Sequence, residues 1–406
     1  MRDAVICAPI RTAVGRYGGA LRNVDAETLA ETIVRALVER TEIDPAAVED
    51  CILGHCNGNG ETPAIGRQAA LSAGLPVEVP GFQLDRRCGS GLQAICLGAM
   101  EVQTSAADLV IAGGVESMST ADFYTSAVRW GPNRLSINLI DRLNRARVTA
   151  GGRRYVIDGG MIETAENLAR KYTISRQEQD EYALRSHQRA VAAWNEGRFD
   201  EEVVPVTAPP AKRGATETIF RKDEHPRPDT SLEKLAGLRP LMAGKIPDAT
   251  VTAGNSSGEN DAAACCLVTT EEKAKELGLK PRAKLLSWAV AGVHPAYMGL
   301  GPVASSKKAL ERAGLTLADI ELVELNEAFA AQTLACTREW NLAERDFDRL
   351  NVNGSGISIG HPVGATGARM MATTLFEMTR RGAETGLVTM CIGGGQGISA
   401  VVKLLA

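Results

Sequence analysis

The chain contains two similar copies of one helix-and-strand unit. Residues 88–117 run as a glycine-rich loop, a helical pattern, a polar turn and a short apolar strand that ends in paired glycines, and residues 361–397 follow the same order. A second pairing joins 35–55 with 307–327, each a helical pattern followed by a turn and an apolar strand. Helices that alternate with buried strands imply parallel sheets and right-handed crossovers. We therefore expect a duplicated α/β fold with two similar halves; the alternative is chance likeness between unrelated βαβ units, which share this pattern for physical reasons.

A segment of different character separates the two copies. It has more proline, arginine and polar residues and fewer buried-strand signals, and within it Ser175 and Glu178 form a capping box that opens a helix reaching Trp194. We expect this segment to be an insertion between the halves. The predicted domains are residues 1–118 plus 250–272 for the N-terminal half, 119–249 for the inserted loop domain, and 273–406 for the C-terminal half.

Composition restricts the partners of the chain. The 406 residues carry a formal net charge of −4 and only 4% aromatic residues, so we expect no nucleic-acid partner. No apolar run approaches the roughly 18 residues of a membrane helix, and the N-terminus lacks the layout of a signal peptide, so we expect no membrane association. Nine cysteines without an export signal favour a reducing cytoplasm over a disulfide framework. Cys51, His55 and Cys56 lack a fourth ligand, so we expect no metal site.

The inserted segment also contains a run of basic residues. Between Arg129 and Arg154 there are seven arginines against one acidic residue, Asp141. A solvated face is the favoured interpretation of this run, because surface arginines are common. A position near the phosphates of a ligand is the alternative.

Cys88 stands in the stretch RRCGSGLQAICLGAM, directly before an apolar helical pattern. A helix N-terminus presents unpaired amides and a positive dipole end, which stabilise a thiolate, and Arg87 adds positive charge. Gly89 and Gly91 remove side chains, so that a substrate can approach. We therefore favour a reactive thiol with a lowered pKa over a buried, inert cysteine.

Three other positions supply polar groups from matching places in the fold. His361 occupies the loop–helix junction of the second copy, where Pro362 fits the first turn of a helix, and a Cys–His couple provides a nucleophile and a base. Cys391 ends a buried strand before three glycines, whose amides can form either an oxyanion hole or a simple tight turn. Asn326 follows another strand. Ligands in open α/β sheets bind at the carboxyl ends of strands, so the four groups are expected to converge.

Together these blocks make the chain similar to the thiolases, which are acyl-CoA acetyltransferases. The resemblance covers nearly the whole sequence, from APIRTAVGR onward, and the set of motifs is highly specific although none is so alone. It implies a five-layered α/β/α/β/α fold made of two similar halves, with a loop domain inserted in the first. The matching blocks are CGSGLQA (88–94), TVTAGNSSGENDAA (250–263), NEAFA (326–330), GHPVGATG (360–367) and CIGGGQG (391–397).

The resemblance implies a role for each catalytic position. Cys88 is the nucleophile that takes the acyl group, and His361 activates it. Cys391 is the acid/base at the α-carbon of acetyl-CoA. Asn326 holds a water that helps His361 bind the thioester oxygen, and the backbone amides of Cys88 and Gly393 form a second oxyanion hole. No cofactor is expected, because coenzyme A and acetyl-CoA are substrates.

Further matches concern coenzyme A, and one position departs from the family pattern. The coenzyme A contacts implied by the resemblance are Ser257, Arg227, Met161 and Met298. Acetoacetyl-type thiolases carry a histidine where this chain has Gly160, which leaves a pantetheine contact and short-chain selectivity open. The chain is also more basic before the nucleophile, in LDRRC, and more polar in NGSGISIGHP, than the family pattern.

The expected function is thus CoA-dependent cleavage of 3-ketoacyl-CoA, or the reverse Claisen condensation of acetyl-CoA, through an acyl-cysteine. A β-ketoacyl synthase is the alternative enzyme, but it has no need of a second catalytic cysteine such as Cys391. An inactive acyl-CoA- or lipid-binding relative is the non-enzymatic alternative. We expect a cytoplasmic homodimer or homotetramer acting in fatty acid metabolism or β-oxidation; chain length, acyl branching and direction are not set by the sequence.

Overall fold

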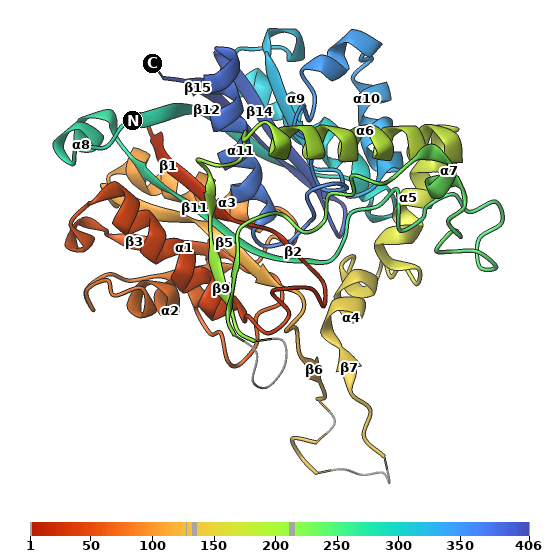
Figure 1. Ribbon diagram of the computed structural model, residues 1–406, viewed down its shortest axis with the longest axis horizontal. Coiled ribbons are helices and arrows are strands. Elements are labelled where there is room, and N and C mark those ends of the chain that lie inside the picture. Colours follow the sequence, from red (N-terminus) through yellow and green to blue (C-terminus); the bar gives the residue numbers. More distant parts are fainter. Residues whose placement is uncertain (1, 127, 132–135, 211–215, 406) are drawn as a thin grey trace.

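The computed structural model of the chain describes residues 2–126, 128–131, 136–210 and 216–405. Figure 1 shows its elements in chain colours. The helices are α1 (Ala26–Thr41), α2 (Ile65–Ser72), α3 (Ser90–Thr104), α4 (Arg142–Thr149), α5 (Gly160–Lys171), α6 (Arg176–Asn195), α7 (Leu232–Ala236), α8 (Glu271–Glu276), α9 (Gly301–Ala313), α10 (Ala330–Glu339) and α11 (Thr366–Arg381). The strands are β1 (Val5–Thr12), β2 (Gly15–Arg16), β3 (Asp50–Gly54), β4 (Phe82–Leu84), β5 (Leu109–Ser117), β6 (Phe123–Tyr124), β7 (Ile140–Asp141), β8 (Val203–Val204), β9 (Val206–Ala208), β10 (Thr218–Phe220), β11 (Asn260–Thr269), β12 (Pro281–Gly292), β13 (Leu322–Leu325), β14 (Thr385–Ile392) and β15 (Gln396–Leu404).

The strand order confirms the predicted duplication. The main sheet runs β13-β14-β15-β12-β1-β11-β5-β3-β4, so each half has the same order read outward from the centre. β3 pairs with β5 as β13 pairs with β14, in parallel, and β5–β11 matches β14–β15, both antiparallel. β1 and β12 pair at the centre and join the halves into one sheet of eleven strands.

The expectation of parallel sheets is confirmed only in part, because each half combines parallel pairs with antiparallel ones. Each half carries one long antiparallel strand, β11 or β15. β15 follows β14 through the glycine turn 393–395, and a connection of three residues can only return antiparallel, since a parallel neighbour needs a crossover. The helix-and-strand pattern correctly placed α3–β5 and α11–β14 but carried no information on the strand that follows.

Helices α3 and α11 pack against each other between the two halves of the sheet. α3 contacts β3 and β5, while α11 contacts β14 as well as β1 and β11, so the pair forms a central layer. α1 and α2 cover the first half from outside, and α9 covers the second (Figure 1). The arrangement is the predicted five-layered fold. It places the N-terminal ends of α3 and α11, the helices that follow Cys88 and His361, side by side.

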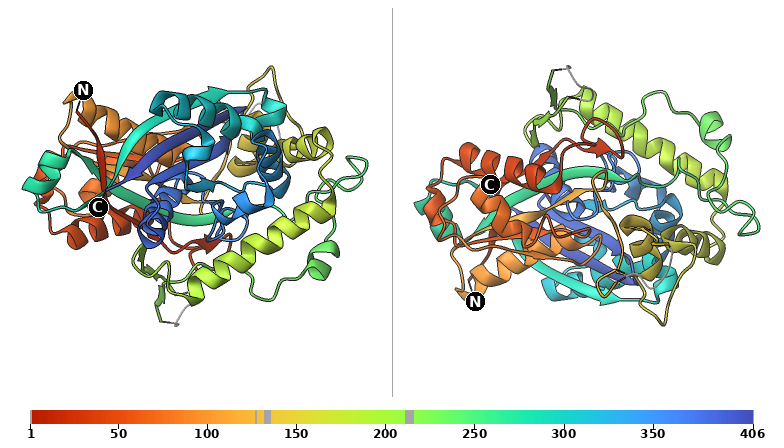
Figure 2. Two further views of the ribbon diagram at one scale, coloured as in Figure 1. Left: turned by 90° about the horizontal axis from the view of Figure 1, so that it is seen from above. Right: turned by 90° about the horizontal axis from the view of Figure 1, so that it is seen from below.

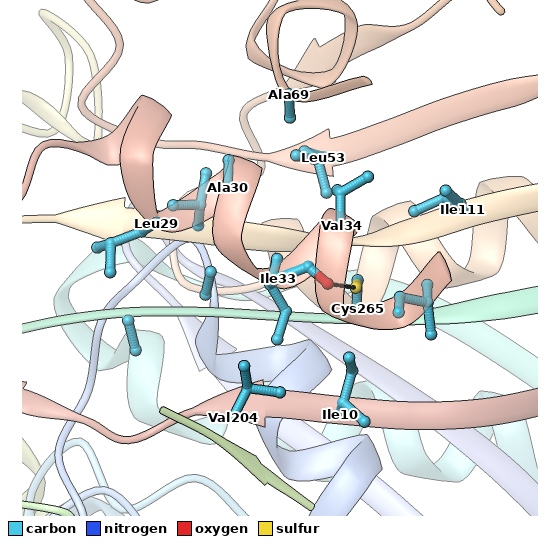
Figure 3. Close-up of a cluster of buried hydrophobic side chains, with 14 of the residues drawn as sticks. Ile10, Leu29, Ala30, Ile33, Val34, Leu53, Ala69, Ile111, Val204 and Cys265 are labelled. Carbon is cyan, nitrogen blue, oxygen red and sulfur yellow. Dashed lines mark hydrogen bonds between the residues drawn. The ribbon is translucent and has the colours of Figure 1, made fainter. Parts of the chain in front are cut away.

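The apolar side chains that these layers bury form the core. In Figure 3, Ile33 and Val34 of α1 lie over β11 and β5, where they meet Cys265 and Ile111. The Cys265 thiol also contacts the carbonyl oxygen of Ile33, at 3.7 Å. Burial of this α1 face accounts for its spacing of apolar residues, and Asp25 caps the helix by accepting from the amide of Thr28.

The inserted segment lies along the outside of the two halves. α6 has the predicted capping box at Ser175 and Glu178 and continues to Asn195, one residue beyond the expected end. It runs along the flank of the molecule (Figure 2, yellow-green). β6 and β7 pair as a hairpin that extends away from the body (Figure 1). No helix in the described part of the chain is long and apolar enough to cross a bilayer.

Candidate active site

One cavity of about 610 Å³ brings together most of the side chains singled out from the sequence. Its size suits a small-molecule ligand, and its walls come from both halves and from the inserted segment. A smaller cavity of about 430 Å³, formed by the loop 240–249, contains none of the predicted residues. The predicted residues that line the larger cavity are Cys88, Met161, Arg227, Ser257, Met298, His361, Cys391 and Gly393.

Close backbone approach holds the loops of the two halves together at this cavity. A Cβ built on Gly114, in β5, would lie 2.0 Å from the carbonyl oxygen of Gly364, and one on Gly91 would lie 2.8 Å from the same atom. Only glycine permits these contacts. The loop that carries His361 therefore packs directly on β5 and on α3, the helix that follows Cys88.

Cys88 precedes α3 by one residue, with Gly89 as the N-cap, as the sequence predicted. Its thiol pKa, however, is raised above the ordinary value, because burial outweighs the hydrogen bonding of the Gly393 and Cys88 amides and the charge of Arg87. The predicted lowering of the pKa was therefore wrong for the free site. The stabilising groups are present, but removing the thiolate from water has the larger effect.

His361 has a neutral imidazole held in one orientation. Burial lowers its pKa to about 3, helped by the charges of Arg369 and Arg147. Its Nδ1 lies 2.7 Å from the hydroxyl of Thr366, which itself donates to the carbonyl oxygen of Pro362 at 2.9 Å. Because that hydroxyl has one proton and uses it on Pro362, Nδ1 carries the imidazole proton and Nε2 is free to accept one.

The structure corrects the predicted role of Pro362 and adds a backbone contact that holds His361. Pro362 does not open the helix: α11 begins at Thr366, and Pro362 instead starts a turn whose carbonyl accepts from the amides of Ala365 and Thr366. The backbone amide of His361 donates to Asn260 Oδ1 at 2.8 Å, and Asn260 also reaches the carbonyl of Gly15. The histidine is therefore fixed at its backbone and at its ring.

Asn326 lies beside Nε2 of His361 and is not among the residues that line the cavity. Its amide nitrogen is 3.4 Å from His361 Nε2, while its Oδ1 is buried and has no partner within the described chain. A buried acceptor without a partner is uncommon, and an ordered water is one way to satisfy it. This geometry suits the predicted role of holding a water beside His361.

Cys391 is the penultimate residue of β14, directly before the turn of glycines, where Gly394 and Gly395 adopt positive φ. The side chain is buried, and its pKa is raised well above the ordinary value by burial and by the proximity of Cys88. Two thiols thus share the cavity, and the proximity of Cys88 disfavours ionisation of Cys391. The raised pKa keeps the side chain of Cys391 a thiol at neutral pH.

The region predicted for coenzyme A is assembled from separate segments. Met161 Sδ lies 3.2 Å from the position of a Cβ on Gly393, so it borders the oxyanion amides. Gly160 has φ of +59°, and a Cβ there would lie 3.3 Å from Arg147 Cβ. In this chain, Arg147 therefore packs against Gly160, the position where acetoacetyl-type thiolases carry a histidine.

The basic run of the inserted segment divides between the two interpretations. Arg142 pairs with Asp122 on a partly exposed surface, which agrees with the interpretation of this run as a solvated face. Arg147 instead lines the cavity and pairs with Glu259 at 2.5 Å. Arg134 lies outside the described residues.

Sequence reasoning missed several residues that shape the site. Thr366 orients His361, and Glu116 accepts from the amides of Cys56, Asn57 and Gly364 at 3.0–3.2 Å. Thr366 was visible within GHPVGATG, but its role depends on the turn. Glu116 gave no signal, because its partners come from distant loops.

The polar residues of NGSGISIGHP also have partners. The hydroxyl of Ser355 donates to Glu324 Oε1 at 2.8 Å, which Arg369 also contacts, and Ser358 accepts from Ser186 at 2.8 Å. These contacts explain why this loop tolerates hydroxyls in a buried position. Among the residues described, no cluster of three histidine, cysteine or acidic side chains is arranged to hold a metal ion.

Comparisons with known proteins agree with the geometry. Residues 4–272 match the thiolase N-terminal domain and residues 279–404 match the thiolase C-terminal domain. The chain is 45% identical over 403 residues to an acetyl-CoA acetyltransferase of Pseudomonas aeruginosa, covering 98% of both chains. It is 44% identical over 412 residues to a β-ketoadipyl-CoA thiolase of Pseudomonas knackmussii, covering 99% of both. The crystal structure of the Bacillus anthracis acetyl-CoA acetyltransferase superposes with a TM-score of 0.93 at 43% identity, covering 100% of this chain and 99% of that one.

Proposed function

Since the chain belongs to the thiolase family and is an acyl-CoA C-acyltransferase, we propose that it cleaves 3-ketoacyl-CoA with a second coenzyme A, or runs the reverse condensation, through an acyl group on Cys88. The observation that carries this proposal is the cavity shared by Cys88, His361 and Cys391. A Claisen cleavage needs a nucleophile, a base and a separate acid at the α-carbon, and these three groups can supply them.

Each step has a group in place. Nε2 of His361 accepts the Cys88 proton as the sulfur attacks the keto carbon, and the amides of Cys88 and Gly393 stabilise the oxyanion. The carbon–carbon bond breaks, and Cys391 gives its proton to the departing acetyl-CoA carbanion. His361, with a water held by Asn326, stabilises the enolate oxygen of that carbanion. The thiol of the second coenzyme A then passes its proton to Cys391 and attacks the acyl-Cys88 thioester. Cys88 leaves as a thiolate and takes back the proton from His361, which releases the shortened acyl-CoA and restores the starting state.

High thiol pKa values fit this scheme. The free site holds a neutral thiol and a neutral imidazole, so the proton moves only when the electrophile is present. Cys391 is fully protonated at neutral pH and can serve as the acid in the cleavage direction. Coenzyme A takes part as a substrate, and the scheme uses no metal ion or prosthetic group.

The test is replacement of Cys88. Cys88→Ala is expected to lose thiolysis of acetoacetyl-CoA and of longer 3-ketoacyl-CoA by a factor on the order of 10⁴ or more, because the acyl intermediate cannot form. Cys391→Ser is expected to retain acylation of Cys88 by acetyl-CoA, visible as a mass increase in the intact protein, because a thiolate leaves without a strong acid, but to lose turnover of 3-ketoacyl-CoA. Full activity of Cys88→Ala would refute the proposed nucleophile. A malonyl-CoA decarboxylation assay separates this function from a β-ketoacyl synthase.

We also propose that the chain works as a homotetramer or homodimer. The hairpin of β6 and β7 exposes Phe123, Trp130 and Leu139 by 60%, 93% and 66%, and such apolar surface commonly marks an interface. Light scattering of the wild type and of Trp130→Ser measures the assembly. A monomeric wild type would contradict this proposal.

A reducing compartment such as the cytoplasm, and a role in fatty acid metabolism or β-oxidation, are the remaining parts of the proposed function. All nine cysteines of the structure are free thiols, and the two in the cavity must stay reduced to act. Relatives of nearly equal identity carry different substrate names, acetyl-CoA acetyltransferase and β-ketoadipyl-CoA thiolase, so overall similarity does not set the acyl chain. The residues around the nucleophile must do so.

A further inference from the structure

The two arginines before the nucleophile have different environments. Arg86 donates to Gln396 Oε1 at 3.1 Å, across the boundary between the halves, and so has a structural contact. Arg87 instead lines the cavity directly beside Cys88. Its backbone adopts φ of +49°, a conformation that non-glycine residues adopt uncommonly.

The guanidinium of Arg87 has donors to spare. Within the described part of the chain it makes no hydrogen bond, and its closest carboxylate oxygen, on Asp85, is 3.5 Å away. Asp85 is itself half exposed. The neighbouring carboxylate of Glu116 is already occupied by backbone amides and by Asn57 Nδ2. A partly buried guanidinium with free N–H donors can bind a planar anion such as a carboxylate.

Arg147 and Arg227 also line the cavity, but each has a partner or an expected role that Arg87 lacks. Arg147 is neutralised by Glu259 at 2.5 Å. Arg227 matches a coenzyme A contact in the family. The phosphates of coenzyme A lie at the far end of the pantetheine arm from the thioester, whereas Arg87 adjoins the sulfur that receives the acyl group. Arg87 is therefore suited to the acyl part of the substrate and not to the phosphates.

We propose that Arg87 is a specificity-determining residue that selects 3-ketoacyl-CoA substrates whose acyl chain ends in a carboxylate. The planar fork of the guanidinium can donate to both oxygens of such a group, while a methyl-terminated chain of equal length leaves the cation with only the half-exposed carboxylate of Asp85, 3.5 Å away. The inference rests on the proposed function, because it concerns the acyl chain that is transferred to Cys88.

The test compares two substrates of equal length. 3-Oxoadipyl-CoA and 3-oxohexanoyl-CoA both have a six-carbon acyl chain, and they differ in a terminal carboxylate or methyl; homologues with one and two more methylenes locate the best length. The wild type is expected to show a higher kcat/KM for the acidic member of at least one pair. Arg87→Gln is expected to lower the acidic-to-neutral ratio of kcat/KM by roughly 10- to 100-fold, because any effect on the Cys88 thiol lowers both substrates alike and cancels in the ratio. Arg87→Lys, which keeps the charge without the fork, should fall between.

The paired design separates recognition from an effect on the thiol. Arg87 also favours the Cys88 thiolate, and a loss of that influence would lower both substrates equally. Arg35→Gln, which removes an exposed cation on α1 far from the cavity, controls for net charge. An unchanged acidic-to-neutral ratio in Arg87→Gln would overturn the inference.

The wild type alone also tests the proposal if Arg87→Gln does not fold. Cleavage of the neutral substrates with no preference for any acidic partner would overturn the inference and leave the proposed function standing. Inactivity of the wild type toward every member of both series would overturn the two together.

Discussion

Thr366→Val isolates the contact that orients the catalytic base. The substitution keeps the shape of the side chain but removes the hydroxyl that lies 2.7 Å from His361 Nδ1. The carbonyl of Pro362 keeps two amide donors, so the group left without a partner is the Nδ1 proton. Leaving a buried donor unpaired costs about 1–3 kcal/mol.

The imidazole can avoid that cost by moving its proton to Nε2, but it then cannot accept the proton of Cys88. Either outcome raises the free energy of activation by a similar amount. A rise of about 1.4 kcal/mol slows the reaction tenfold. We therefore expect kcat for thiolysis to fall about 10- to 100-fold, with a smaller change in KM, because substrate contacts are unaltered.

Steady-state thiolysis of a 3-ketoacyl-CoA, followed by loss of substrate absorbance, measures the effect. Thr366→Ser is the matched control: it keeps the hydroxyl, loses one methyl group and should retain most of the activity. Denaturant unfolding of both variants separates a catalytic effect from a loss of folded protein. Equal kcat values for Thr366→Val and Thr366→Ser would refute the tautomer argument.

Three further outcomes follow from the site. The rate of Cys88 alkylation by iodoacetamide should rise about tenfold per pH unit through neutral pH up to a midpoint above that of an ordinary cysteine, because its raised pKa keeps it a thiol; a plateau at pH 6–7 would instead reveal a thiolate–imidazolium pair. Gly364→Ala should destabilise the fold by about 1–3 kcal/mol and reduce kcat, because its Cβ would lie 2.4 Å from the carbonyl oxygen of Val115. Gly60→Ala, which has open space around it, is the control, and it should change neither the unfolding free energy nor kcat. Asn326→Ala should lower kcat by about 10- to 100-fold while Cys88 still accepts an acyl group in intact-mass measurements, because the enolate side of the reaction would lose its water.

The periodic parts of the sequence determined the architecture. Apolar runs with flanking glycines located α3–β5 and α11–β14, and their likeness revealed the duplication that the strand order then displayed. The capping box at Ser175 placed the start of α6. These features are local, since a helix start or a buried strand is encoded by residues within a few positions of one another. The glycine setting of Cys88 and His361 was likewise readable in short windows.

The electrostatic state of the site was decided only by the tertiary structure. A helix N-terminus and an arginine suggested an acidic thiol at Cys88, yet the surrounding layers remove most of the water around it, and this desolvation raises its pKa. The same burial makes His361 a neutral base. Thr366 and Asn326 acquire their relation to the imidazole only when β13 and the turn before α11 are brought together. Desolvation and hydrogen bonding depend on every element that surrounds a group, and most of those elements are remote in the chain.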